Sequence, residues 1–337
     1  MIRRALAMGS LAFLGGCAGF QNALGGQGAE SANFVGLFEL FMAVCTIMYL
    51  LVAVGLVVAV WRRRKAGSML TVDNRQHHAT SAAVQPALVA WAALVIVGLT
   101  ALTVASFFTD RSNAAAGSNP KLKITVTANQ WWWNVEYVTT DASRMVRTAN
   151  EIHLPVGVPV EVTLKSNDVI HSFWIPNLAG KQDLIPGRVT DAQLLPRKTG
   201  LYRGQCAEFC GDDHALMALD VTVESKADFD RWYNAQLQPA FAPVTPLQLA
   251  GYRFITTRQC SSCHNIAGTP AGGRVAPDLT HFASRRSIAA GTLPMNKGNL
   301  YGWIADPQSQ KPGNHMPTIG MAPDDVHAVV AYLQRLK

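Results

Sequence analysis

Two long stretches without a charged side chain dominate the first third of the chain. Leu40–Trp61 contains 22 residues and Pro86–Thr109 contains 24. As helices, both are long enough to cross the hydrocarbon core of a bilayer, which is roughly 30 Å thick. The basic run Arg62–Lys65 follows the first stretch and places the connecting loop in the cytoplasm by the positive-inside rule. The pattern therefore predicts a transmembrane hairpin over residues 34–110, with both outer ends outside the cytoplasm.

The residues before this hairpin have the pattern of a signal peptide. Arg3 and Arg4 are followed by an apolar stretch that is too short to span a bilayer. It ends in Leu-Gly-Gly-Cys17, which resembles a bacterial lipobox. The resemblance implies a signal peptide over residues 1–16, lipidation of Cys17 and a periplasmic segment over residues 17–33. An ordinary signal peptide with an incidental cysteine is the alternative.

Alternation of apolar and polar residues with period two begins after residue 118. Lys121–Thr127, Val158–Leu164 and Leu219–Val223 alternate in this way, and Pro, Gly and Asn residues interrupt the chain between such segments. Several short strands at this spacing favour an antiparallel sandwich or barrel. We therefore predict an all-β domain over residues 118–226.

The end of the chain has a helical pattern. Three prolines in Leu237–Leu247 predict a semi-rigid linker, which we place over residues 227–247. Leu249–Gln259 is short and amphipathic, and a terminal helix is expected over Pro323–Leu336. These segments predict a small all-α domain over residues 248–337.

Composition and charge narrow the class of protein. Of the 337 residues, 49% are hydrophobic and only 15% are charged, whereas soluble chains carry about 25% charged residues. The net charge of +7 does not indicate nucleic-acid binding, because the positive charge is divided between the basic run of the hairpin and residues 248–337. Residues 118–247 hold 12 basic and 14 acidic side chains, and residues 248–337 hold 9 and 4. We expect a multidomain membrane protein without a nucleic-acid partner, whose last two domains dock through opposite charge.

A cluster of soft metal ligands lies in the β region. Cys206, Cys210, His214 and Met217 fall within twelve residues, and His171 supplies a second imidazole from another loop. Such ligands select copper or zinc over magnesium or calcium. A blue-copper site needs one cysteine and a structural zinc site needs no methionine, so the set matches a two-copper centre. A disulfide between the two cysteines is the alternative in an oxidising compartment.

A second cofactor motif, Cys260-Ser-Ser-Cys263-His264, lies in the helical region. The pattern C-x-x-C-H is typical of covalent haem attachment, with two thioether bonds and the histidine as an iron ligand. A thioredoxin-like redox pair and a chance match are the alternatives. The location outside the cytoplasm and a Met-Pro pair about fifty residues later favour haem c.

The helical region as a whole resembles a small class I cytochrome c. The resemblance implies that Met316 is the second axial ligand of the iron, with Met321 and Met295 as rivals. It also implies that the carbonyl of Pro277 accepts a hydrogen bond from the His264 ring, which would fix the orientation of that ring.

The hairpin and the β region, residues 33–226, resemble subunit II of cytochrome c oxidase with its binuclear copper centre CuA. The resemblance rests on the motif C-x-E-x-C-x3-H-x2-M, on the segment His171–Pro176 (HSFWIP) and on the aromatic segment Gln130–Tyr137 (QWWWNVEY). It implies a cupredoxin-like Greek-key fold for the β domain.

The same resemblance assigns roles to individual residues. It implies six copper ligands: bridging Cys206 and Cys210, capping His171 and His214, and the weaker ligands Met217 and the Glu208 carbonyl. The Glu208 side chain would help to hold a Mg²⁺ ion shared with subunit I, a role that suits a carboxylate. Trp131 would be the residue through which electrons enter the copper domain.

The whole chain resembles the variant of cytochrome c oxidase subunit II that carries a fused C-terminal cytochrome c. The resemblance implies an electron path from an external donor, such as a cytochrome c or a bc1-type complex, through haem and copper to subunit I, where O₂ becomes water. Subunit III would be a further partner. The chain would lie in the bacterial inner membrane, with both cofactor domains in the periplasm. The chain would belong to a proton-translocating oxidoreductase and perform no bond chemistry itself.

Two other functions compete with this one. A structural subunit of a quinol oxidase would have lost the copper ligands, which this chain retains. A free-standing lipoprotein carrier would serve a different terminal reductase. One departure from the family is also present, since residues 78–86 (HATSAAVQP) lack the carboxylate that often begins the second helix and serves proton uptake.

Overall fold

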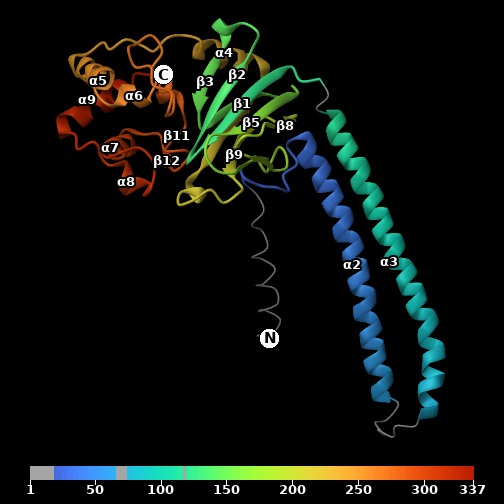
Figure 1. Ribbon diagram of the computed structural model, residues 1–337. Coiled ribbons are helices and arrows are strands. Elements are labelled where there is room, and N and C mark those ends of the chain that lie inside the picture. Colours follow the sequence, from blue (N-terminus) through green and yellow to red (C-terminus); the bar gives the residue numbers. More distant parts are fainter. Residues whose placement is uncertain (1–18, 66–73, 117–118) are drawn as a thin grey trace, which may run out of the picture. The chain divides into compact units, whose positions relative to one another are not determined.

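The computed structural model describes residues 19–65, 74–116 and 119–337. The expected signal peptide and Cys17 lie outside the described residues. The chain divides into two compact units, one of residues 33–115 and one of the other described residues. Figure 1 shows the two long helices of the first unit and the mixed β and α structure of the second.

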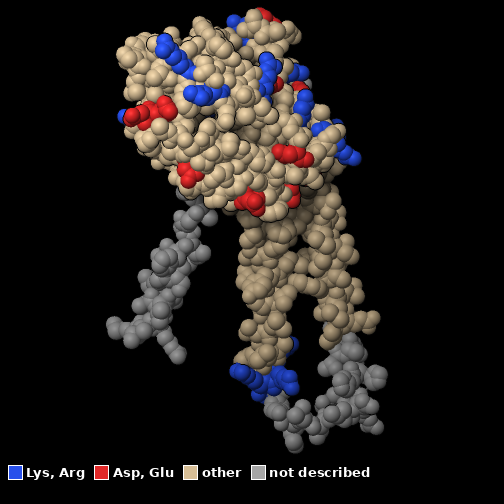
Figure 2. Space-filling view, turned by 60° about the vertical axis from the view of Figure 1, so that its left-hand side comes forward, with Lys and Arg blue, Asp and Glu red and all other residues tan. Residues whose placement is uncertain are grey.

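The helical hairpin consists of α2 (Ala29–Lys65) and α3 (Asn74–Ala116). The side-chain amides of Asn33 and Asn113 are joined by a 2.6 Å hydrogen bond, which ties the start of α2 to the end of α3. Both helices are long and apolar enough to cross a membrane, and within the described part of the chain their most apolar windows are not buried. The basic side chains of the last turn of α2 gather at one end of the hairpin (Figure 2). The two predicted helices are confirmed and extend beyond the uncharged stretches.

Two five-stranded sheets form the β module, which we define as residues 119–236. The first sheet, in the order β3-β2-β1-β5-β8, contains β1 (Leu122–Asn129), β2 (Trp132–Val138), β3 (Val146–Ala149), β5 (Val160–Ser166) and β8 (Thr190–Leu194). The second, in the order β4-β10-β9-β6-β7, contains β4 (Glu151–Pro155), β6 (His171–Trp174), β7 (Gln182–Leu184), β9 (Gly200–Cys206) and β10 (Ala218–Glu224). The predicted all-β domain is confirmed.

The period-two pattern determines which side chains fill the space between the sheets. In β1, Ile124, Val126 and Ala128 are fully buried, while the residues between them are partly exposed. The pairs β1–β5 and β4–β10 are parallel, with Val126 opposite Leu164 in the first. Because parallel neighbours require a crossover connection, the sheets are not simple meanders.

The helical module, which we define as residues 246–337, is built mainly from α5 and α9. Its elements are α5 (Pro246–Thr257), α6 (Cys260–Cys263), η4 (Phe282–Ser284), the hairpin β11 (Ser287–Ile288) and β12 (Leu293–Pro294), α7 (Lys297–Ala305), α8 (Pro307–Gln310) and α9 (Pro323–Leu333). A Cβ atom at Gly251 of α5 would lie 2.0 Å from the Ala328 carbonyl oxygen of α9. Only glycine therefore allows these two helices to approach so closely.

The expected linker over residues 227–247 is partly wrong, because it begins with the helix α4 (Lys226–Gln236). The Ser225 side chain accepts a hydrogen bond from the Asp228 amide and caps this helix. Phe229 is buried in the sandwich core, and the Trp232 ring stacks on His153 with 4.0 Å between the centroids. α4 therefore belongs to the β module, and the prolines of the extended segment follow it.

Candidate metal and haem sites

The candidate metal ligands of the β module meet at one end of the second sheet. His171 begins β6 and Cys206 ends β9, and these strands are paired neighbours. The loop after β9 carries Cys210 and leads to the short helix η3 (His214–Leu216), which Met217 terminates. Pairing of the two strands thus brings together residues that lie 35 positions apart in the chain.

Ligand atoms in this cluster lie within reach of a shared metal centre. The two cysteine sulfurs are 3.7 Å apart, and His171 Nδ1 lies 3.8 Å from the Cys206 sulfur. His214 Nδ1 and the Met217 sulfur lie 3.6 and 4.0 Å from the Cys210 sulfur. All of these side chains are buried except His214, which is partly exposed.

The two cysteines do not form a disulfide. A sulfur–sulfur bond is about 2.0 Å long, so a separation of 3.7 Å leaves two free thiols. The hydrogen bond with Cys210 lowers the pKa of Cys206 to about 3, and the same contact raises the pKa of Cys210. One thiolate is therefore stabilised without a metal, and a thiophilic metal would stabilise the second. This donor set of sulfur and imidazole fits copper.

The orientation of His171 is fixed from its outer side. Its Nε2 atom lies 2.7 Å from Oδ1 of Asp168, so Nδ1 faces the cysteine sulfurs. The other Asp168 oxygen accepts a hydrogen bond from the Gln130 amide. A carboxylate behind a ligating histidine fixes its tautomer and strengthens it as a ligand. Sequence analysis did not single out Asp168, although its position three residues before a ligand was an available signal.

Trp131 connects the metal cluster to the helical module. Its indole Nε1 donates a 3.0 Å hydrogen bond to the Cys210 carbonyl, which also accepts a bond from the Gln130 side chain. The Trp131 ring lies against His315, with 5.3 Å between the centroids, and only 7% of the residue is exposed. His315 directly precedes Met316. Trp131 thus contacts both the metal loop and the segment that carries a predicted iron ligand.

A cavity of about 510 Å³ lies at the C-x-x-C-H motif. The side chains of Cys260, Cys263 and His264 line it, and Met316 lies on its wall. The rival methionines Met295 and Met321 are packed on the hydrophobic core of the helical module. The size of the cavity and its largely apolar lining suit a prosthetic group, and the residues present fit a covalently bound haem.

The His264 ring is prepared to bind a metal through one nitrogen. Burial lowers its pKa, so the ring is neutral near pH 7. Nδ1 lies 2.7 Å from the Pro277 carbonyl, which can only accept a hydrogen bond. The proton of the neutral ring must therefore be on Nδ1, and the lone pair of Nε2 is available to the cavity.

The β module and the helical module share a polar boundary. Arg285 of the helical module forms a buried ion pair with Glu151 of β4 at 3.7 Å. Backbone bonds also cross the boundary, since the Ala218 amide donates to the Ala290 carbonyl at 2.9 Å. One oppositely charged pair is thus buried at this boundary, whereas Arg286 is exposed; docking of the two domains through opposite charge stays a prediction.

Lys311 is the most deeply buried cation at this boundary among the described residues, with 2% of it exposed. Burial lowers its pKa to about 8, while interaction with Asp213 raises it, so the ammonium form predominates near pH 7. Sequence analysis did not single out Lys311, since a lysine in a Pro-Gly loop is normally solvated.

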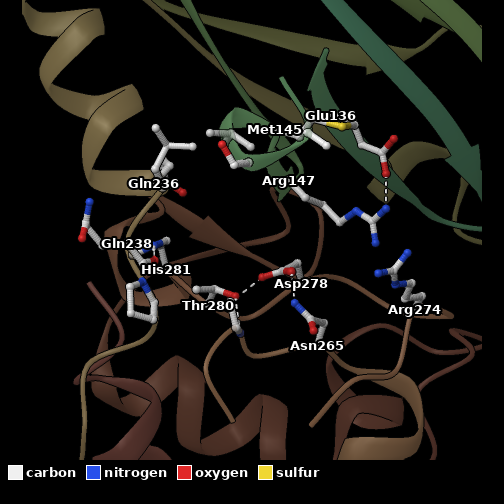
Figure 3. Close-up of a pocket in the computed structure, with 16 residues that line it drawn as sticks. Glu136, Met145, Arg147, Gln236, Gln238, Asn265, Arg274, Asp278, Thr280 and His281 are labelled. Carbon is white, nitrogen blue, oxygen red and sulfur yellow. Dashed lines mark hydrogen bonds and ion pairs between the residues drawn. The ribbon is translucent and has the colours of Figure 1, made fainter. Parts of the chain in front are cut away.

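A second cavity at the boundary, of about 480 Å³, is lined by polar groups of both modules (Figure 3). On its β side Arg147 pairs with Glu136, and on its helical side Asn265 donates a hydrogen bond to Asp278. It contains none of the predicted site residues. We therefore assign the cofactor chemistry to the first cavity and the metal cluster.

The backbone and the side chain of Glu208 face two different environments. Its backbone carbonyl lies 3.2 Å from the Cys206 sulfur, within the metal cluster. Its carboxylate is partly exposed and lies 3.4 Å from the Lys181 ammonium. The backbone therefore faces the metal cluster, while the side chain is accessible to a partner.

Comparison with known proteins supports two cofactor domains. The family described as cytochrome c oxidase subunit II, periplasmic domain, matches residues 122–225, and the cytochrome c family matches residues 249–337. Cytochrome c oxidase subunit 2 of Alkalihalophilus pseudofirmus is 31% identical over 329 residues, which cover 96% of this chain and 94% of that protein. The subunit 2 of Bacillus sp. (strain PS3) is 36% identical over 227 residues, covering 64% of this chain and 62% of that protein. The crystal structure of the periplasmic domain of subunit II from Bradyrhizobium japonicum has 30% identity and a TM-score of 0.33, covering 36% of this chain and 96% of that domain.

Proposed function

The chain belongs to the cytochrome c oxidase subunit 2 family, and we propose that it is the subunit through which electrons enter a bacterial aerobic respiratory oxidase. The subunit II domain over residues 122–225 implies a CuA copper centre, and the cytochrome c domain over residues 249–337 implies haem. Electrons would pass from an external donor through the helical module to the β module, and then to subunit I, where O₂ is reduced to water. The bound groups supply the one-electron chemistry, and the residues of this chain bind, orient and shield them.

The observation that carries this proposal is the position of Trp131. This single side chain donates a hydrogen bond to the backbone carbonyl of Cys210 and contacts His315, which directly precedes Met316. From Met316 the path consists of a peptide link to His315, a ring contact and a hydrogen bond to the Cys210 carbonyl. Because the helical module covers Trp131, an external donor would deliver electrons to the helical module instead of to this tryptophan.

We assign the copper ligands from the distances within the cluster. Cys206 and Cys210 would be the principal thiolate ligands, because their sulfurs are 3.7 Å apart and each has a histidine Nδ1 within 3.8 Å, so that His171 and His214 would complete the set. Met217 and the Glu208 carbonyl approach one sulfur each and would be the weaker ligands. Asp168 holds one histidine in place. Burial of Cys206, Cys210, His171 and Met217 would keep water away from most of the centre, so its charge would be poorly screened.

We assign the haem-binding residues from the lining of the other cavity. Cys260 and Cys263 would form the two thioether bonds, and His264 and Met316 would be the iron ligands. Pro277 orients the histidine through its carbonyl. Covalent attachment means that the haem cannot dissociate from a domain that is exposed to the periplasm.

Assembly in the membrane completes the proposal. The hairpin would anchor the chain in the bacterial inner membrane beside subunits I and III, with Cys17 lipidated. The exposed Glu208 carboxylate would share a Mg²⁺ ion with subunit I, since hard cations prefer carboxylate oxygen. A cytochrome c or a bc1-type complex would act as the electron donor.

Metal analysis of the purified full-length chain tests this function. We expect two coppers per haem iron, and reduction of the haem by a donor before reduction of copper. Cys210→Ser should abolish copper binding and leave the haem in place, whereas Cys45→Ser, a change in α2, should alter neither. Haem without copper in the wild-type chain would contradict the proposal and favour a structural subunit of a quinol oxidase. If the chain purifies without any large haem–copper subunit, a free-standing carrier is favoured instead.

A further inference from the structure

The Lys311 ammonium is surrounded by three backbone carbonyls. It donates hydrogen bonds to the carbonyls of Trp131 at 2.9 Å, Leu216 at 3.0 Å and Ala289 at 3.4 Å. An ammonium has three N–H groups, so its donors are all satisfied. The first two acceptors belong to the β module, whereas Lys311 and Ala289 belong to the helical module. The side chain therefore crosses the boundary.

The two acceptors in the β module are next to the metal cluster. Leu216 directly precedes Met217, and Trp131 donates its indole N–H to Cys210. Lys311 and His315 lie in one short segment, so the β module holds this segment at two points. The ammonium binds the Trp131 carbonyl, and the His315 ring contacts the Trp131 indole.

The tip of the β11–β12 hairpin supplies independent evidence that the two modules stabilise each other at this boundary. Ala289, Ala290 and Gly291 have positive φ angles of 54°, 57° and 76°. This left-handed conformation is unfavourable for a residue with a Cβ atom, and it persists only when the surroundings enforce it.

Each carbonyl of this strained tip accepts a hydrogen bond at the boundary. The Ala289 carbonyl accepts from Lys311, the Ala290 carbonyl accepts from the Ala218 amide at 2.9 Å, and the Gly291 carbonyl accepts from Arg203 at 3.2 Å. The last two donors belong to the β module. The docked modules therefore offset the cost of a backbone conformation that an isolated hairpin would not favour.

We propose that Lys311 is a positioning residue that holds the helical module on the β module and so fixes the Met316 segment against Trp131. The expected consequence of this docking is rapid electron transfer within the chain, and that consequence rests on the function proposed above. Because the three bonds are buried, they are screened little by salt, unlike charges that meet at a solvated surface. Docking should therefore persist at high ionic strength.

The variant that tests this role is Lys311→Met, which keeps the length of the side chain and removes its donors. Lys297→Met is the matched control, because Lys297 is an exposed lysine of the same module. Both are made in the full-length chain with its copper and haem. Amide hydrogen exchange at Ala218, whose N–H crosses the boundary, reports docking without requiring electron transfer. The rate of haem-to-copper electron transfer after a light pulse reports its consequence.

In the wild-type chain we expect the Ala218 amide to be protected equally at low and high salt. Lys311→Met should lower this protection and slow the transfer by about tenfold or more, since small displacements of reacting groups have large effects on rate. Lys297→Met should change neither. The methionine–iron absorption band should persist in Lys297→Met, because Lys297 does not line the cavity that Lys311 and Met316 share.

Three results would overturn the role of Lys311. They are an unprotected Ala218 amide in the wild-type chain, loss of its protection as salt is raised, or wild-type exchange and rate in Lys311→Met. The first two need no variant, so a Lys311→Met protein that fails to fold does not prevent the test. A failure of the proposed function would give a different result. The haem of the wild-type chain would then be reduced while its copper stays oxidised, even if the protection of the Ala218 amide depended on Lys311.

Discussion

His153 should make the stability of the β module depend on pH between about 6.5 and 8. Its Nδ1 atom lies 2.8 Å from a Glu224 oxygen, its Nε2 atom lies 3.9 Å from a Glu151 oxygen, and its ring stacks on Trp232. Burial lowers the pKa of His153, but the attraction of the two nearby carboxylates, Glu151 and Glu224, outweighs burial and raises the pKa from 6.5 to about 8. The imidazolium is therefore the favoured form in the folded state.

The size of the effect follows from the difference between folded and unfolded states. A pKa raised from 6.5 to about 8 corresponds to about 2 kcal/mol of free energy of unfolding. The folded pKa lies above the unfolded pKa, so this stabilisation is fully present below pH 6.5. It is lost as the pH rises through 8, where the folded protein also releases the proton.

Urea unfolding of a fragment spanning residues 119–337, at pH 6 and at pH 9, measures this contribution. The loss of stability between these values should be about 2 kcal/mol larger in the wild type than in His153→Gln, because other groups that titrate in this range, such as Lys311 with its pKa of about 8, contribute equally to both proteins. His327→Gln, which changes an exposed histidine on α9, is the control and should behave as the wild type. An equal loss of stability in the wild type and His153→Gln would refute the reasoning, because the titrating group would then lie elsewhere.

Two further substitutions test the other structural arguments. Asp168→Asn removes the charge behind His171 and should weaken copper retention about 10- to 100-fold, measured by copper content after dialysis against a chelator. Unchanged retention would show that the carboxylate does not support the ligand. Gly251→Ala places a methyl group against the Ala328 backbone and should destabilise the helical module by about 1–3 kcal/mol, measured as a lower melting temperature. A melting temperature equal to that of the wild type would show that α5 and α9 can separate without cost.

Much of the architecture could be predicted because it depends on short-range patterns. The hairpin follows from two uncharged stretches and a basic run, since water and lipid select side chains by polarity. The strands follow from period-two alternation, and β1 buries its apolar positions as that pattern predicts. The C-x-x-C-H motif places three candidate haem-binding groups within five residues. In each case the physical determinant lies within a few residues of sequence.

Prediction was weaker where a segment depends on a partner. The helix α4 lies where a linker was expected, because its proline-rich continuation obscured a capped, amphipathic segment. Trp232 and Phe229 become informative only when the sandwich core against which they pack is known. Tertiary packing stabilises such short helices, since helix propensity alone is insufficient at this length.

Short sequence patterns indicate the candidate sulfur and imidazole ligands and the two long apolar helices. The connection between the candidate copper and haem motifs depends instead on how distant segments pack. Trp131 and His315 lie 184 positions apart, and their contact requires both modules to fold and then dock. Lys311 has an ordinary loop sequence, yet it is buried because three carbonyls from separate segments replace its water. Long-range contacts of this kind depend on the packing of whole domains, which no local pattern of residues specifies.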